Sequence, residues 1–442
     1  MARPLYTLLL WLGLPLVLLR LLWRARRQPQ YLQHIGERFG WYGGQHPPAA
    51  VRRRLWLHAV SVGETRAAQP LVRALLDRFP GHTLLLTCTT PTGRATALEL
   101  YAGYGERVAC LYLPYDYPFA VRRFLRRFAP VAGLIMETEI WPNLVAGCAA
   151  AGVPLALVNA RLSARSAARY RRFDALARPA FAGLAWVAAQ TEDDRERLRA
   201  RGSRVVSVTG NLKFDVASAP DLVARGLAWK RERESRARGA ASAAAAEVVP
   251  GTARGMLLAA STREGEELLL LDALAPLIRA GYLLALVPRH PQRFDEVARL
   301  IGARGYVLAR RSQGERVASE VEVWLGDSMG EMPAYYAAAD CAYVGGSLLP
   351  YGGQNLIEAC ALGCPVLIGP HTFNFTQAAE EAVAAGAALR VADAHSLAEA
   401  AQRLLADAPA RARMGEAGRM FTQAHRGATE RTMALVETLV GK

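Results

Sequence analysis

Acidic residues follow two short apolar runs of this sequence and are its first candidates for chemistry. Glu64 comes after the alternating run Arg54–Val62, and Glu137 comes directly after Val131–Met136. A carboxylate held where a strand turns into a helix is well placed to act as a general base. An acid in a first helical turn also has a plain structural role, because it stabilises the helix dipole. Both roles stay open for Glu64 at this point.

The stretch Ala342–Pro370 combines a strand, a glycine-rich turn and a helix. Ala342–Gly346 has the pattern of a buried strand, and Leu356–Leu362 has helical spacing. Glycines in the turn let the backbone approach a ligand closely, and Asn355 can cap the helix, so the turn suits a phosphate. Glu358 would either stabilise the helix dipole or accept hydrogen bonds from a sugar diol.

Two further loops follow apolar runs in the same half of the chain. Leu283–Val287 is followed by Pro288 and Arg289, and Gly326–Met332 follows a short strand-like run. Open parallel sheets bind ligands in the loops at the carboxyl ends of their strands. Arg289 could form a bidentate pair with a phosphate. The three loops are therefore expected to converge on one crevice.

Strand-like runs alternate with helical segments along most of the chain, which predicts doubly wound parallel sheets. One such run, Val205–Val208, precedes Lys213, another cation at a strand end. We expect an α/β protein with two domains. The expected boundaries are a first domain at 28–220, a basic and alanine-rich linker at 221–254, a second domain at 255–425, and a C-terminal helix at 426–442 that packs back across both.

Composition limits the partners and the compartment. The 442 residues are 52% hydrophobic, enough for two cores of ordinary size, and carry a formal net charge of +15. This charge implies an acidic partner. The arginines are scattered and no nucleic-acid signature is present, which favours a lipid over nucleic acid. The six cysteines have no metal-binding spacing and fit a reducing cytoplasm.

The first 27 residues form a candidate membrane anchor. Leu5–Trp23 is almost wholly apolar, interrupted by Pro15 and Arg20, and is expected either to span the bilayer once or to lie in its interface. More arginines follow this segment than the single Arg3 that precedes it, so the positive-inside rule places the domains in the cytoplasm. The same arginines would attract anionic lipid.

Several long motifs in fixed order together resemble the 3-deoxy-D-manno-octulosonic acid (Kdo) transferases of lipid A biosynthesis. The resemblance covers nearly the whole chain, and its motifs are HAVSVGE (58–64), METEIWPNL (136–144), NARLSARS (159–166), GNLKFD (210–215), VPRHPQRF (287–294), GDSMGEM (326–332) and GPHTFNF (369–375). It implies an inverting glycosyltransferase of the GT-B type, with two Rossmann-like domains facing a cleft. The implied donor is CMP-Kdo, and the implied acceptor is lipid IVA, an anionic lipid A precursor at the inner membrane.

The resemblance also assigns roles to individual residues. The general base falls on Glu64, its supporting acid on Glu137 and the motif lysine on Lys213. The CMP contacts fall on Pro288, Arg289, Met329, Gly330, Glu331, Asn355, Leu356, Ile357 and Glu358. Many members have histidine where this chain has Gln354. No cofactor or metal is expected, because there is no Asp-x-Asp motif and cations can stabilise the leaving phosphate.

Two other functions remain open from the residues alone. A GT-B enzyme that uses a UDP-sugar, or an epimerase of the same architecture, would have comparable loops. A membrane-tethered module that binds nucleotide without turnover would share the glycine-rich turn. Competition between CMP and UDP would distinguish the first alternative, and an assay for turnover would distinguish the second.

Overall fold

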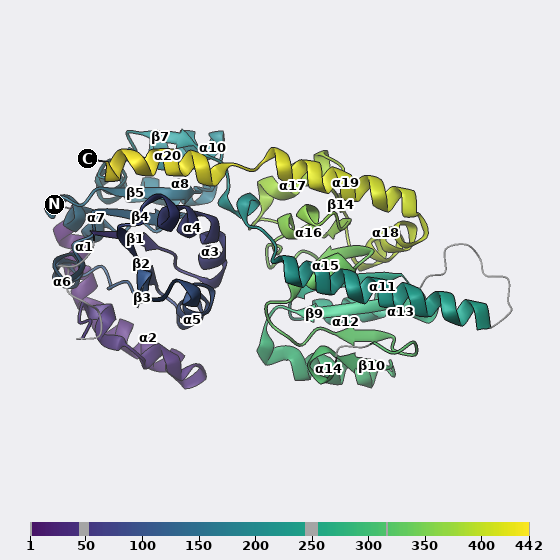
Figure 1. Ribbon diagram of the computed structural model, residues 1–442. Helices are drawn as coiled ribbons and strands as arrows, with labels where there is room; N and C mark the ends of the chain where they lie inside the picture. The colour runs from purple at the N-terminus through teal and green to yellow at the C-terminus, as the bar shows by residue number, and fades with distance from the viewer. Residues whose placement is uncertain (1, 44–52, 244–254, 315–316, 442) are drawn as a thin grey trace. The chain divides into compact units, whose positions relative to one another are not determined.

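The computed structural model describes residues 2–43, 53–243, 255–314 and 317–441. These residues form two compact units; in Figure 1 the first is coloured from purple to teal, together with the yellow C-terminal helix, and the second from teal to yellow. The first unit comprises 1–216 together with 425–442, and the second comprises 217–424. Each unit has the α/β architecture expected from the alternation of strand-like runs and helical segments.

The first unit is built on a seven-stranded parallel sheet with the order β3-β2-β1-β4-β5-β6-β7. Chain order reverses at β1, because β1 pairs with β2 on one side and with β4 on the other. Ligands bind at such a switch point in open α/β sheets. The strands are β1 (Arg53–His58), β2 (His82–Cys88), β3 (Val108–Tyr112), β4 (Ala132–Met136), β5 (Leu155–Ala160), β6 (Val187–Ala189) and β7 (Val206–Val208).

Helices cover both faces of this sheet, which is why strands such as β4 and β5 read as continuous apolar runs. Trp56 on β1 is fully buried in the core on one face, while Leu57 is fully buried on the other. The helices are α3 (Val62–Ala67), α4 (Gln69–Arg78), α5 (Pro91–Leu100), α6 (Pro118–Phe128), α7 (Pro142–Ala150), α8 (Ala164–Arg172), α9 (Asp174–Ala182) and α10 (Glu192–Ala200). Short 3-10 turns are η1 (Pro29–Leu32), η2 (Ile35–Phe39), η3 (Ala102–Arg107) and η4 (Leu212–Asp215).

The second unit repeats the plan with the strand order β10-β11-β9-β8-β12-β13-β14, all parallel. Its switch point lies at β8, between β9 and β12. The strands are β8 (Met256–Thr262), β9 (Leu283–Pro288), β10 (Leu308–Arg310), β11 (Val323–Leu325), β12 (Cys341–Val344), β13 (Val366–Ile368) and β14 (Ala388–Arg390). The helices and turns are α11 (Pro220–Ala243), α12 (Glu266–Ala273), α13 (Ala275–Arg279), η5 (Pro291–Arg293), α14 (Phe294–Ala303), η6 (Arg311–Gln313), α15 (Met332–Ala338), α16 (Ile357–Ala361), α17 (Thr376–Ala384), α18 (Ala394–Ala406) and α19 (Ala408–Ala424).

The passage 221–254, predicted to be a linker that is helical at first, is helical in its first part. Residues 220–243 form α11, which belongs to the second unit, and residues 244–254 lie outside the described part of the chain. Arg233 on α11 donates to Asp340 at 2.6 Å, and Trp229 packs edge-on against Trp324 with ring centroids 5.0 Å apart. These partners are about a hundred positions away in the sequence, so the charged, alanine-rich composition alone did not indicate them.

The N-terminal apolar segment forms two helices, α1 (Ala2–Leu12) and α2 (Leu14–Arg27), with a bend of 50° between them. The break falls at Gly13, two residues before Pro15, which lacks the N–H that would continue the helical hydrogen bonding. Among the described residues, no single helix has both the length and the apolar composition of a membrane span, whereas this bent pair taken together has both.

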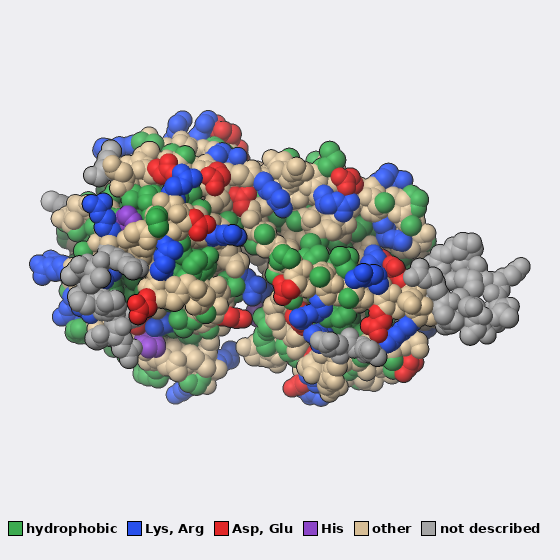
Figure 2. Space-filling view, in the orientation of Figure 1, with side chains coloured by type: hydrophobic (Ala, Val, Ile, Leu, Met, Phe, Trp, Pro, Cys, Tyr) green, Lys and Arg blue, Asp and Glu red, His purple; other side chains and the backbone are tan. Residues whose placement is uncertain are grey.

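The C-terminal helix α20 (Ala428–Val440) packs on the first unit. Asp215, the last residue of the GNLKFD motif, accepts hydrogen bonds from the backbone N–H groups of Gly427 and Thr429 at 2.7 and 2.6 Å. Arg78 on α4 forms an ion pair with Glu437 on α20. On the face seen in Figure 2, lysine and arginine side chains are spread among acidic and apolar ones rather than gathered in one stripe.

Candidate functional site

The switch point of the first unit brings several predicted residues to one edge of the sheet. Glu64 follows β1 and Glu137 follows β4, and these two strands are neighbours in the sheet. Asn159 lies at the end of β5, the next strand along. Glu137 and Asn159 both have left-handed backbones, with φ of 58° and 51°. Such conformations are uncommon for residues with side chains and often occur where a strand end shapes a functional site.

Glu64 is half-buried in the first turn of α3, where three hydrogen bonds connect it with Ser61 and Val60. The Ser61 hydroxyl donates to Glu64 Oε1 at 3.0 Å, and the Val60 backbone N–H donates to Oε2 at 2.8 Å. Ser61 also caps the helix by accepting from the Glu64 N–H. These hydrogen bonds fix the direction of the Glu64 carboxylate in the first turn of the helix.

Electrostatics make Glu64 an unusually basic carboxylate. Burial and then the negative charge of Glu137 raise the pKa of Glu64 to about 8, against the lowering effect of the hydrogen bonds from Val60 and Ser61. Burial and the charge of Glu137 also raise the pKa of Glu139. Lys213 Nζ lies 3.5 Å from Glu137 Oε1. The structure thus brings together Glu64, Glu137 and Lys213, the three residues predicted for catalysis.

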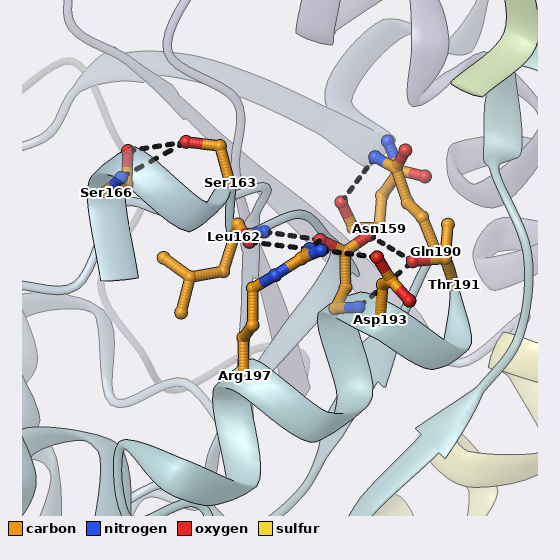
Figure 3. Close-up of polar contacts among 9 residues, drawn as sticks. Asn159, Leu162, Ser163, Ser166, Gln190, Thr191, Asp193 and Arg197 are labelled. Carbon is orange, nitrogen blue, oxygen red and sulfur yellow. Dashed lines mark hydrogen bonds and ion pairs between the residues drawn. The ribbon is translucent and has the colours of Figure 1, made fainter. Parts of the chain in front are cut away.

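Asn159, at the end of β5, holds the segment that carries Lys213. Its side-chain oxygen accepts from the backbone N–H of Leu212 at 3.0 Å, which fixes the turn that carries Lys213. Figure 3 shows Gln190 donating to the Asn159 backbone oxygen, a bond of 2.9 Å. The same view shows Arg197 of α10 directed at Leu162 and Asp193, which holds the NARLSARS segment against that helix.

Glu137 should set the proton affinity of Glu64. Replacing Glu137 with glutamine removes a negative charge that raises the pKa of Glu64. We expect the pH profile of kcat/KM to move toward lower pH in this variant, because Glu64 then ionises more easily. A profile that stays in place, or moves toward higher pH, would contradict this coupling.

In the second unit, the glycine-rich turn packs on the end of β8 and is held by a buried acid that the sequence reasoning missed. Glu266 accepts four hydrogen bonds, from the Tyr343 hydroxyl at 2.6 Å and from the backbone N–H groups of Gly346, Leu348 and Arg263 at 2.6, 3.1 and 2.9 Å. The available signal was the pair of acids, Glu266 and Glu267, shortly after the strand at the start of the next helix.

The turn itself needs its glycines. A Cβ on Gly345 would lie 2.6 Å from the Ser261 backbone oxygen, and Gly346, Gly352 and Gly353 have φ of 71°, 92° and 77°. Asn355 Oδ1 accepts from the Ile357 N–H at 3.1 Å, as the predicted cap requires, although α16 is only five residues long. The side chains of Leu356 and Ile357 are buried, so only their backbone could meet a ligand.

Basic side chains gather at the end of β9. The Arg289 N–H donates to Thr262 O at 3.0 Å, which joins the ends of β9 and β8. Burial, followed by the charges of Arg263, Arg289 and Arg293, lowers the pKa of His290. Burial raises the pKa of Tyr336, and its neighbours Glu358 and Arg289 act on that pKa with opposite signs. Arg289 and Glu358 thus both lie near this tyrosine, as expected for converging loops.

The loop after β11 is held differently from the other two. Glu331 Oε1 accepts from Arg225 at 2.6 Å and from Arg311 at 2.9 Å, and Ser328 donates to its other oxygen. Its carboxylate is therefore part of a network of ion pairs. Met329 is exposed, and a Cβ on Gly330 would meet open space, so the backbone of this loop is accessible.

In the part of the chain that the structure describes, no group of three or more His, Cys, Asp or Glu side chains could hold a metal ion. Glu137 and Glu139, which are two positions apart in sequence, are engaged as described above, the first with Lys213.

Comparison with known proteins places the chain. Residues 33–216 match the family model of the 3-deoxy-D-manno-octulosonic-acid transferases, and residues 281–421 match the model of glycosyl transferases group 1. The 3-deoxy-D-manno-octulosonic acid transferase of Bordetella pertussis is 48% identical to this chain over the full length of both. This chain belongs to the 3-deoxy-D-manno-octulosonic acid transferase family.

Other comparisons agree with that assignment. The 3-deoxy-D-manno-octulosonic acid transferase of Haemophilus influenzae is 35% identical, over 99% of this chain and 98% of the relative. The crystal structure of UDP-GlcNAc 2-epimerase from Neisseria meningitidis superposes with a TM-score of 0.55 at 16% identity, covering 88% of this chain and 100% of that one. Such a likeness shows the fold alone. It confirms two Rossmann-like domains of the GT-B type.

Proposed function

We propose that this Kdo transferase moves Kdo from CMP-Kdo to lipid IVA with inversion at the anomeric carbon. The acceptor hydroxyl attacks the anomeric carbon, the bond from that carbon to the CMP phosphate breaks, and the hydroxyl proton passes to Glu64. The observation that carries the proposal is the placement of Glu64 beside Glu137 at the switch point, where its pKa rises to about 8.

Glu64 has the properties that a general base needs. A base is most effective when its pKa lies near the working pH, because enough of it is ionised and the ionised form still binds a proton well. The hydrogen bonds from Ser61 and Val60 fix the direction of the carboxylate. Glu137 raises its proton affinity, and Lys213 balances the charge of Glu137 at 3.5 Å. Glu137 and Lys213 therefore support Glu64 rather than replace it.

The second unit supplies the chemistry for the donor. Arg289 would bind the phosphate of CMP, and its positive charge would stabilise the charge that grows on that phosphate as it leaves. The backbone of the turn before Asn355 and the loop at Met329–Glu331 would contact the nucleotide, with Glu358 next to its sugar. Pro288 ends β9 and thereby sets the position of Arg289. No metal is required for this scheme.

We infer that the enzyme works at the cytoplasmic surface of the inner membrane. Tyr6 of α1 donates to Asp116 at 3.0 Å and Thr7 donates to Asn143 at 3.1 Å, so one face of α1 is fastened to the first unit. The opposite side of the helix is apolar and exposed, at Leu5, Leu8, Leu9 and Leu12. This division favours a helix that lies in the membrane interface over one that crosses it.

The direct test is to incubate the full-length protein with CMP-Kdo and lipid IVA and to weigh the products. Each Kdo added should appear as a fixed mass increment on the lipid, with release of CMP.

A nucleotide competition assay is the companion experiment. CMP should compete with the donor and UDP should not; competition by UDP at equal concentration would point to a UDP-sugar donor, and CMP binding without a product would point to a module without turnover.

Replacing Arg289 with methionine should weaken CMP-Kdo binding about tenfold to a hundredfold, because a charge-assisted pair with the phosphate is lost. Titration calorimetry with CMP as the ligand measures this directly. Arg299, which is exposed on α14, provides the matched control, and its methionine variant should bind CMP as the wild type does. Equal affinities for all three proteins would remove Arg289 from the donor site.

A further inference from the structure

A groove of about 1180 Å³ lies in the first unit at the edge of the sheet away from Glu64. It is lined at the starts of three strands, by Arg53 of β1, Val131 before β4 and Val153 before β5. Glu64, by contrast, follows the carboxyl end of β1. A six-residue strand spans roughly 20 Å, and this length separates the groove from Glu64. A ligand in the groove is therefore too far from Glu64 for its hydroxyl to be the one that Glu64 activates.

The groove is open because small residues line one of its walls. Helix α7 contributes Ala146, Gly147, Ala150 and Ala151. A Cβ on Gly147 would lie 2.6 Å from Val121 Cγ1, so α6 and α7 pack closely and leave the space along their outer surfaces. Leu439 and Val440 at the end of α20 add apolar surface. Figure 1 shows α1, α6 and α7 together at this side of the first unit.

The rim of the groove is basic. Four of its lining residues are arginines, and no Asp or Glu occurs among the described residues that line it; the four are Arg3, Arg53, Arg122 and Arg126. Arg122 and Arg126 are one helical turn apart on α6, so they lie on one face of that helix. A concave site with an apolar wall and unbalanced positive charge is complementary to an amphiphile with an anionic head.

We propose that this groove, the α6–α7 groove, binds one acidic phospholipid. The phosphate of the lipid contacts Arg122 and Arg126, and its acyl chain lies over the small residues of α7. Charge complementarity supports a lipid, and so does continuity with α1. Arg3 and Thr7 of that helix line the groove, while its exposed leucines face outward. The site is separate from the proposed acceptor site, and the proposal does not depend on the transfer reaction.

The test uses a soluble probe and the full-length protein. Short-chain phosphatidylglycerol, kept below its micellar concentration, is titrated into wild type and into an Arg122→Gln/Arg126→Gln double variant. We expect the affinity to fall about twentyfold, since each arginine near an anionic lipid contributes a factor of about five. Arg403→Gln/Arg413→Gln is the control, because both of these arginines are exposed on the second unit and the change in net charge is the same.

Three further measurements decide the identity of the ligand. Short-chain phosphatidylcholine, which is neutral overall, should bind wild type far more weakly than phosphatidylglycerol does. Ala150→Trp, at an exposed position of the wall, should fill the groove and weaken binding without a loss of thermal stability. CMP affinity should be unchanged in all variants. The proposal is overturned if the double variant binds phosphatidylglycerol like wild type, if both lipids bind equally, or if inorganic phosphate displaces the lipid at the same concentration.

Discussion

Replacing Glu64 with glutamine should lower the rate of Kdo transfer about a thousandfold, because the amide cannot accept the proton of the acceptor hydroxyl. The affinity for CMP should stay the same, since the proposed donor contacts all lie in the second unit. Single-turnover mass spectrometry measures the rate, and calorimetry with CMP measures the binding. Glu99→Gln is the matched control, because Glu99 is exposed on a neighbouring helix of the same unit.

The pH dependence offers an independent test of the same assignment. Only the ionised form of a base accepts a proton, so with a pKa of about 8 the rate should rise with pH and level off above that value. Glu64→Gln should remove this rise from any residual activity. A wild-type rate that is flat between pH 6 and 9, or a glutamine variant with near-normal turnover, would exclude Glu64 as the base.

The raised pKa also makes a statement about stability. In the unfolded chain a glutamate ionises near 4.5, whereas folded Glu64 resists ionisation up to about 8. The folded state therefore binds the proton more tightly, and the stability that this provides is present below the lower value and is lost as pH rises toward the upper one. The melting temperature of Glu64→Gln minus that of wild type should therefore be larger at pH 9 than at pH 5. A slower transfer rate together with this gain in melting temperature would show that the variant has lost the base and not the fold.

Much of the fold and part of the site could be predicted from local sequence. Continuous apolar runs followed by glycine, proline or acidic residues are typical of buried parallel strands, and these runs became β4, β9 and β12, while the alternating run Arg54–Val62 contains most of β1. Residues placed at strand ends in sequence lie at the same sheet edge in space, which is why Glu64 and Glu137 are close together in the structure. The resemblance to the Kdo transferases then supplied the roles that spacing alone left open.

What could not be predicted depends on partners far apart in the chain. Glu331 is paired with Arg225 and Arg311, and α11 is docked through Arg233 and Asp340, contacts that no local pattern indicates. The break at Gly13 was also missed, because an apolar run of sufficient length reads as one helix until the bend is seen. Charge composition likewise predicted an acidic partner, but the groove that could receive it depends on how tightly α6 and α7 pack.

Glu266 is the most consequential residue that local patterns did not reveal, and replacing it with glutamine should destabilise the second unit by about 3 kcal/mol. Its two carboxylate oxygens accept four hydrogen bonds, three of them from buried donors. A glutamine keeps only one of these two acceptor oxygens and has an NH₂ group in place of the other. That NH₂ group faces N–H or O–H donors, so at least one buried N–H is left without a partner. Thermal or urea unfolding of the full-length protein should show an earlier transition for this unit, while the first unit should unfold as in wild type.

The same substitution should weaken CMP binding about tenfold, because the turn at Gly346 and Leu348 loses the acid that holds it. Glu264→Gln is the control: that side chain is exposed two residues away, and its variant should match wild type in both stability and affinity. CMP binding should be measured well below the unfolding temperature, so that loss of stability is separated from a change in the shape of the turn. A folded variant whose glycine-rich turn has become mobile binds CMP weakly, whereas a variant that is only less stable binds it normally. Normal affinity in folded Glu266→Gln would mean that the turn keeps its shape without the carboxylate, and Glu266 would then serve the stability of the unit alone.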